Sequence, residues 1–185
     1  MILIVDLNFR RDSLGFYEFV LPIAYAIGDL DVCSFRHYSD ITPADVTKSS
    51  GIILSGTPLK DHATLNELAK FTWLKNCQKP VLGICAGMQT IALLFGAKLE
   101  KCLSLGMTRI VTTASNPLFS SIFQAYTLHN YSLKSSKVFE ILAESEKCVQ
   151  AIKHRNKDIF GVLFHPEVRN PEIIQRFVQS FPGTE

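Results

Sequence analysis

The chain has 185 residues, of which 47% are hydrophobic and 19% are charged, and its formal net charge is +2. This composition is too apolar for a disordered chain, and the length is sufficient for one domain with a full core. The charges are nearly balanced and form no basic run or stripe, so the sequence indicates binding neither to nucleic acid nor to a membrane surface.

The N-terminal segment and the cysteines bear on location. The segment MILIVD has no basic residue before it, and no apolar run approaches the roughly 18 residues that a membrane-spanning helix needs. We therefore expect a first strand here, and neither a signal peptide nor a membrane span. The five cysteines are odd in number, irregularly spaced and without a C-x-x-C motif. A disulfide framework or a zinc site is not expected, and a reducing cytoplasm is the expected location.

In chain order, the first half alternates between apolar strands and helical segments. We expect strands over 1–6, 30–35, 51–56 and 80–85, helices over 16–28, 65–76 and 86–97, and a helical turn at 43–46. The helix over 16–28 should begin or bend at Pro22, and Gly96 is placed to end the helix over 86–97. The strand over 80–85, PVLGIC, is continuously apolar, which is typical of a parallel strand covered on both faces.

The helix over 65–76 is predicted from one apolar face. Leu65, Leu68, Ala69 and Trp73 recur at helical spacing. Together with the strands, these helices predict a doubly wound α/β sheet for the first half.

The second half changes character, with successive strands and little helix between them. We expect strands over 98–113, 124–133, 137–145, 147–154 and 158–164, and a last helix over 171–181 with Pro171 near its start. No repeat, low-complexity segment or linker divides the chain. The sequence therefore predicts one domain, 1–185, with an open, mostly parallel sheet flanked by helices and an additional antiparallel strand region.

A cysteine stands at the joint between a predicted strand and a predicted helix. Gly83-Ile84-Cys85-Ala86-Gly87 has the G-x-nucleophile-x-G spacing of a nucleophile elbow, a strained turn in which larger side chains two residues away would collide. The free N–H groups and the dipole of a helix N-terminus favour a thiolate at such a joint. The N–H of Ala86 would point to where an oxyanion forms. A buried structural cysteine between two packing glycines is the alternative.

A thiolate nucleophile usually works with a histidine that a third group orients. Of the five histidines, His165 follows the apolar run IFGVLF, so we expect it at the carboxyl edge of the sheet, where open α/β sheets place their sites. Glu167 lies two residues on, and Pro166 between them restricts the backbone. The carboxylate could hold one ring nitrogen and leave the other facing the thiol. A strand-end histidine without a catalytic role is the alternative, and the order Cys, His, Glu disfavours a lipase-like hydrolase.

GICAGMQ together with GVLFHPEV resembles the class I, triad-type glutamine amidotransferases, whose pattern is an elbow G-x-C-x-G-x-Q followed by a strand that ends in H-P-E. The resemblance covers most of the chain and implies a flavodoxin-like core. It also implies catalytic roles for Cys85, His165 and Glu167, with no metal or organic cofactor. SGTP at 55–58 falls where the family has its oxyanion loop, which implies that the Gly56 N–H is the second oxyanion donor beside that of Ala86.

Further residues follow from the resemblance alone. Gln89 matches a glutamine whose side chain helps to hold the substrate. HNYSL at 129–133 resembles the family segment whose backbone grips the two ends of glutamine, which implies that Tyr131, Ser132 and Leu133 line the pocket. AIKH at 151–154 resembles the strand that pairs with the H-P-E strand. His129 could be a pocket residue or a solvated strand residue, and we favour the second; Asp6 is expected only to cap the first strand.

The implied reaction converts L-glutamine to glutamate and ammonia through a thioester on Cys85. The family passes ammonia to a synthetase, and since the sequence carries no synthetase we expect a separate synthetase subunit. GMQ and the amidotransferase-only length resemble the separate glutaminase subunit of archaeal GMP synthase, whose partner is of the ATP-pyrophosphatase type. The anthranilate and aminodeoxychorismate synthase branches remain open. So do a γ-glutamyl hydrolase or peptidase that acts alone and a non-catalytic relative that binds glutamine or a partner.

Overall fold

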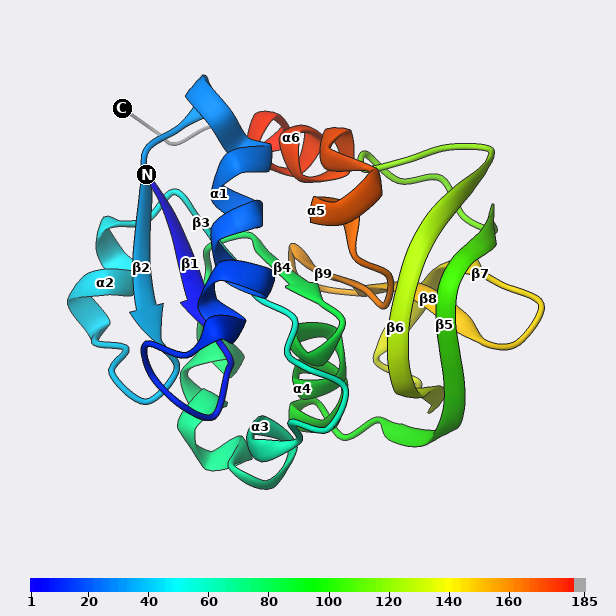
Figure 1. Cartoon of the computed structure of the whole chain (residues 1–185), viewed down its shortest axis with the longest axis horizontal. Helices are drawn as coiled ribbons and strands as arrows, with labels where there is room; N and C mark the ends of the chain where they lie inside the picture. Colours follow the sequence, from blue (N-terminus) through cyan, green and yellow to red (C-terminus); the bar gives the residue numbers. More distant parts are fainter. Residues whose placement is uncertain (182–185) are drawn as a thin grey trace.

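A computed structural model describes residues 1–181, which form one mixed sheet of nine strands with helices on both faces (Figure 1). The strand order is β2-β1-β3-β4-β9-β8-β7-β5-β6. The strands are β1 (Ile2–Asp6), β2 (Cys33–His37), β3 (Gly51–Leu54), β4 (Val81–Ile84), β5 (Lys98–Thr112), β6 (Ile122–Ser135), β7 (Phe139–Glu144), β8 (Val149–His154) and β9 (Ile159–Val162).

The helical segments are short. They are a π-helical turn (Phe16–Val20), α1 (Leu21–Ile27), a 3₁₀ turn (Gly28–Leu30), α2 (Pro43–Lys48), α3 (Ala63–Asn66), a 3₁₀ helix (Leu68–Lys75), α4 (Ala86–Leu94), α5 (Pro166–Arg169) and α6 (Pro171–Ser180). As expected, α1 begins beside Pro22 and α6 begins at Pro171, and Gly96 follows α4 with a φ of +81°. None of the described helices is long and apolar enough to cross a membrane.

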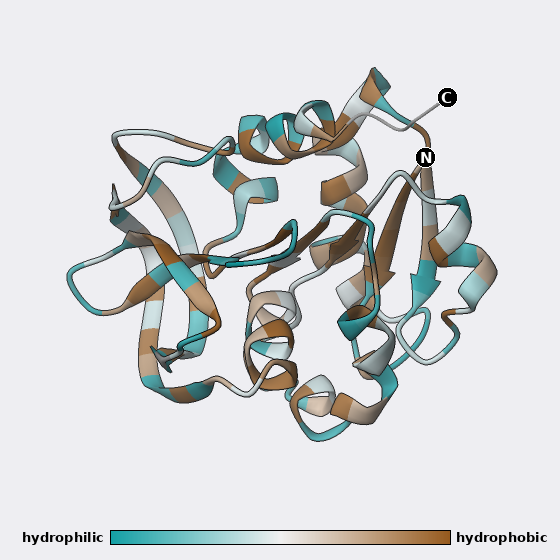
Figure 2. Cartoon of the chain, turned by 180° about the vertical axis from the view of Figure 1, so that it is seen from behind, coloured by the Kyte–Doolittle hydropathy of each residue, from teal (hydrophilic) through white to brown (hydrophobic). Residues whose placement is uncertain are grey.

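The parallel half of the sheet consists of β2, β1, β3, β4 and β9, and both of its faces are covered. Alternate residues of β1 enter different cores: Ile2 and Ile4 pack with α1 and α6, whereas Leu3 and Val5 pack with α4 and the 3₁₀ helix. Figure 2 shows the inner strands in hydrophobic colours between helices with hydrophilic outer faces. Burial on both sides explains why these strands are continuously apolar in the sequence.

The segment over 65–76 is not the single α-helix that its spacing predicted. It forms the short α3 and then the 3₁₀ helix Leu68–Lys75. The buried residues there are Phe71, Leu74 and Cys77, three positions apart, whereas Ala69 is exposed and Trp73 is only partly buried. A repeat of three matches the three residues per turn of a 3₁₀ helix, so the apolar face lies elsewhere than expected.

The second half extends the sheet with antiparallel strands β8, β7, β5 and β6, as predicted, and β8 pairs with β9. This extension curls back on the parallel half. Thr127 of β6 forms a bridge with Phe164, and the N–H of His165 donates to the Tyr126 carbonyl at 2.8 Å. The middle of β6 therefore lies beside the carboxyl ends of β4 and β9, where the predicted site residues are. This mixed sheet agrees with the predicted fold class.

Candidate active site

Cys85 occupies a strained turn between β4 and α4. Its φ is +48° and its ψ is −101°, a conformation that non-glycine residues seldom adopt. A Cβ on Gly83 would lie 2.6 Å from the Gly87 carbonyl carbon, and a Cβ on Gly87 would lie 2.6 Å from the Leu54 carbonyl oxygen. Both distances are too short for real Cβ atoms, so the turn requires glycine on each side of the cysteine. This is the steric arrangement that the G-x-C-x-G spacing predicted.

The Cys85 side chain is nearly buried, with 4% of the residue exposed. Its backbone N–H donates to the Val162 carbonyl of β9 at 2.8 Å. Its thiol donates to the Leu128 carbonyl of β6 at 3.4 Å. The thiol therefore lies between the strand that leads to His165 and the strand that curls back over the sheet edge.

His165 and Glu167 form a buried pair next to this turn. Nδ1 of His165 lies 2.7 Å from Oε1 of Glu167, and 1% of the histidine side chain and none of the glutamate side chain are exposed. The pair follows β9, with His165 preceding the first residue of α5, Pro166. Phe19, from the π-helical turn, covers the imidazole with its ring centroid 5.7 Å away. The structure thus brings together the three residues Cys85, His165 and Glu167, as the sequence predicted.

The environment of His165 favours its protonated form. Burial opposes the charged imidazolium, but the Glu167 carboxylate and then the Cys85 sulfur more than offset this cost, so the pKa of His165 is raised well above its ordinary value. Its other nitrogen, Nε2, is buried and has no hydrogen-bond partner within residues 1–181. A buried ring nitrogen left free beside a thiol is available to exchange a proton there.

Gly56 and Ala86, the predicted oxyanion donors, both border this site. Ala86 is the first residue of α4, so its N–H has no acceptor within the helix. Gly56 follows β3, and a Cβ there would lie 2.7 Å from Cε1 of His165. The imidazole therefore packs directly on the Gly56 backbone, which explains why this position of the SGTP loop lacks a side chain.

The predicted substrate-binding residues are placed unequally. Gln89 borders the cavity at Cys85, and its Nε2 donates to the Tyr131 carbonyl at 2.9 Å. Ser132 is buried and its hydroxyl donates to the Val149 carbonyl, while Leu133 packs in the core under α4. Neither Ser132 nor Leu133 lines the cavity, and the contacts of their side chains lie elsewhere in the sheet and the core.

The cavity is lined instead by residues that the sequence reasoning did not assign to it. They are Leu128 and Asn130 of β6 and part of the loop after β3, with Thr57, Pro58, Leu59, Asp61 and His62. The likeness of HNYSL to a family segment indicated the right strand but placed the lining one to three residues too far along it. No group of three or more histidine, cysteine or acidic side chains in the described part of the chain is arranged to hold a metal ion.

His129 also borders the cavity, and the expectation that it is solvated was wrong. It is 1% exposed, and its Nδ1 lies 2.9 Å from the Cys102 carbonyl. That carbonyl can only accept, so Nδ1 carries the proton and Nε2, which faces the Gln150 amide at 3.4 Å, is the acceptor. Burial lowers the pKa of His129 to about 4. The residue is therefore a neutral, fixed part of the wall between β5, β6 and β8.

Acidification is expected to destabilise the fold through His129. The unfolded chain takes up a proton on this imidazole below its ordinary pKa of 6.5, whereas the folded chain resists protonation down to about 4. Stability is thus complete above 6.5 and is lost as the pH falls, by about 2 kcal/mol at pH 5. Urea unfolding at pH 7 and pH 5 measures this loss. His129→Asn, which retains a donor toward the Cys102 carbonyl, should lack that part of the pH dependence; an equal loss in both proteins would contradict the assignment.

Comparison with known proteins agrees with this geometry. The family described as "Glutamine amidotransferase class-I" matches residues 21–181. The chain belongs to this family. The match includes the Cys85 turn, the loop after β3 and the His165–Glu167 pair, and it confirms the resemblance inferred from GICAGMQ and GVLFHPEV.

Relatives within the class-I amidotransferases share one description, the glutamine-hydrolysing subunit of GMP synthase. The chain is 38% identical over 150 residues to the protein so described from Picrophilus torridus, and the match covers 74% of this chain and 80% of that protein. It is 35% identical over 152 residues to the corresponding protein from Methanocaldococcus jannaschii, with 76% and 78% covered respectively.

Solved structures share the fold. A protein from Thermoplasma acidophilum, described as a putative GMP synthase subunit, superposes with a TM-score of 0.80 at 24% identity, over 97% of this chain and 93% of that one. A glutamine amidotransferase from Thermotoga maritima superposes with a TM-score of 0.70 at 16% identity, over 98% and 82%. Because each match spans nearly all of this chain, the curled antiparallel extension that completes the site is part of an amidotransferase fold.

Proposed function

We propose that this chain hydrolyses L-glutamine to glutamate and ammonia, with Cys85 as the nucleophile, His165 as the proton carrier and Glu167 as the group that orients it. The observation that carries the proposal is the buried 2.7 Å contact between His165 and Glu167 beside the strained Cys85 turn. Nothing in these steps needs a metal or an organic cofactor.

The first half-reaction forms the thioester. The Cys85 thiolate attacks the side-chain amide carbon of glutamine, and the carbonyl oxygen becomes an oxyanion held by the N–H groups of Gly56 and Ala86. When the carbonyl re-forms, the C–N bond breaks and His165 gives its proton to the departing nitrogen, which leaves as ammonia. Gln89 holds the substrate from the side of α4.

The second half-reaction releases glutamate. His165, now neutral, takes a proton from water while the water oxygen bonds to the thioester carbon. The C–S bond then breaks, Cys85 leaves as the thiolate and His165 is again protonated. Glu167 keeps Nδ1 protonated throughout, so that Nε2 alone exchanges the proton.

The relatives described as GMP synthase subunits support a more specific function. We propose that the whole chain, 1–185, is one glutaminase domain whose ammonia goes to a separate synthetase subunit, of the ATP-pyrophosphatase type, in the cytoplasm. The 38% identity to the Picrophilus torridus protein is what favours this branch over anthranilate or aminodeoxychorismate synthase.

Reconstitution with the synthetase subunit from the same cell tests this assignment. We expect glutamine-dependent formation of GMP when both proteins, ATP and the unaminated nucleotide are present, and none when either protein is omitted. Free ammonia should replace both glutamine and this chain. Glutamine-dependent amination with a chorismate-using synthetase instead would move the chain to another branch. Rapid hydrolysis of γ-glutamyl peptides by the chain alone would indicate a γ-glutamyl hydrolase.

A further inference from the structure

The cavity at Cys85 is too small for the substrate proposed above. Its volume is about 10 Å³, which is the space of roughly one water molecule. Pockets that bind small molecules typically have volumes of about 300 Å³ or more. Glutamine can therefore reach the thiol only if part of the cavity wall moves.

One wall is the loop after β3, residues 57–62, and it separates two spaces. Beyond it lies an open groove of about 850 Å³ between the loop and the N-terminal segment 8–18. Pro58, Asp61 and His62 line both the groove and the cavity at Cys85. Displacing this loop would join the closed cavity to the groove, so the loop is the wall whose movement admits a ligand.

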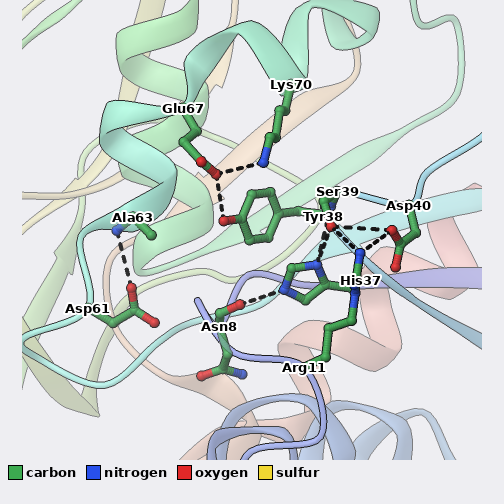
Figure 3. A network of polar contacts seen from close by, with 10 residues as sticks. All are labelled: Asn8, Arg11, His37, Tyr38, Ser39, Asp40, Asp61, Ala63, Glu67 and Lys70. Carbon is green, nitrogen blue, oxygen red and sulfur yellow. Dashed lines mark hydrogen bonds and ion pairs between the residues drawn. The ribbon is translucent and has the colours of Figure 1, made fainter.

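The 57–62 loop is fastened on both sides. On the β6 side, the Asn130 amide donates to the Leu59 carbonyl at 2.9 Å. On the groove side, the Asp61 carboxylate accepts from the N–H of Phe9 at 2.7 Å and from that of Ala63 at 3.1 Å. Figure 3 shows Asp61 held against Ala63, at the margin of a polar network that ties the N-terminal segment to the end of β2. Asp61 therefore anchors the loop, whereas Asn130 holds it from across the mouth of the cavity.

We propose that the hydrogen bond between Asn130 and Leu59 is a latch that holds the 57–62 loop over Cys85, and that substrate enters from the groove when this bond opens. The proposal rests on the proposed function only for the identity of the substrate. Asn130 is thus a positioning residue: it touches the loop and sets how often the site is open. Because one neutral hydrogen bond contributes modestly, its loss should raise the open population about fivefold.

Asn130→Leu tests the latch. Leucine has nearly the shape of asparagine and no donor, and it adds no charge beside the thiol. Asn66→Leu is the matched control, since the Asn66 amide also donates to a backbone carbonyl, that of His62, but from α3 and on the exposed side. The first readout is the rate at which iodoacetamide alkylates Cys85, measured by peptide mass, with the other four cysteines as internal standards.

We expect Asn130→Leu to raise the alkylation rate of Cys85 about fivefold, with Asn66→Leu unchanged. The KM for glutamine should fall by a similar factor at unchanged kcat, because a larger fraction of the chain is competent to bind. An alkylation rate equal to that of the wild type would overturn the latch. Asn130→Ser, whose side chain is too short to reach the carbonyl, replaces the leucine variant if thermal unfolding shows that the latter is not folded.

The two readouts separate the latch from the proposed function. Faster alkylation in a protein that hydrolyses no glutamine would support the latch and refute the glutaminase assignment. Glutamine hydrolysis with the same KM and the same alkylation rate in all variants would support the glutaminase and refute the latch.

Discussion

Cys85→Ala is expected to abolish glutamine hydrolysis, with a loss of kcat of at least about 10⁴-fold. Without the sulfur no thioester can form, and the remaining oxyanion donors act on a substrate that has no nucleophile. Alanine keeps the Cβ, so the backbone strain at φ +48° is unchanged and the fold is not relaxed by the substitution. The measurement is glutamate release, with and without the synthetase.

Intact-protein mass after treatment with a glutamine-mimicking diazoketone provides the matching control. The wild type should gain one adduct, on Cys85, and Cys85→Ala should gain none. Labelling of the wild type only in the presence of cell lysate would mean that a partner opens or completes the site. Retained glutamine hydrolysis by Cys85→Ala would refute the mechanism, because none of the other four cysteines lies in a comparable turn among the described residues.

The sequence predicted those parts of the fold in which local pattern and tertiary packing agree. The strands of the parallel half are apolar throughout because both faces are buried, so their signal does not depend on knowing their neighbours. The G-x-C-x-G spacing was informative for the same reason, since the steric demand of the turn falls on residues only two positions away. The segment over 65–76 was misjudged because two periodicities overlap there, and the core selected Phe71, Leu74 and Cys77.

The composition of the cavity wall was beyond local pattern. It depends on the curl of β6, which brings Thr127 against Phe164 and so places Leu128 and Asn130 over Cys85. The burial of His129 has the same origin, because it faces Cys102 and Gln150 from neighbouring strands. These contacts join residues far apart in sequence, and no spacing rule in a single sequence specifies them.

Glu167→Gln is expected to slow turnover by about 10²- to 10⁴-fold while leaving the KM for glutamine nearly unchanged. The carboxylate contacts the imidazole at 2.7 Å and its side chain is fully buried, so it touches no substrate. An amide of the same shape fills the same space but lacks the charge that stabilises the imidazolium, and it can present its N–H₂ group to Nδ1, which would fix the wrong tautomer. The variant should therefore bind glutamine and transfer its proton poorly.

The pH dependence separates this role from a purely structural one. The Glu167 carboxylate is the largest influence that raises the pKa of His165 against the cost of burial. Removing the negative charge lowers that pKa, so the imidazolium that protonates the departing ammonia is lost at a lower pH. The alkaline limb of kcat should accordingly move toward lower pH in Glu167→Gln, whereas Glu172→Gln, a matched change at the exposed start of α6, should leave it in place. An equal loss of glutamine binding and turnover, with the alkaline limb unmoved, would mean that Glu167 only supports the fold around His165.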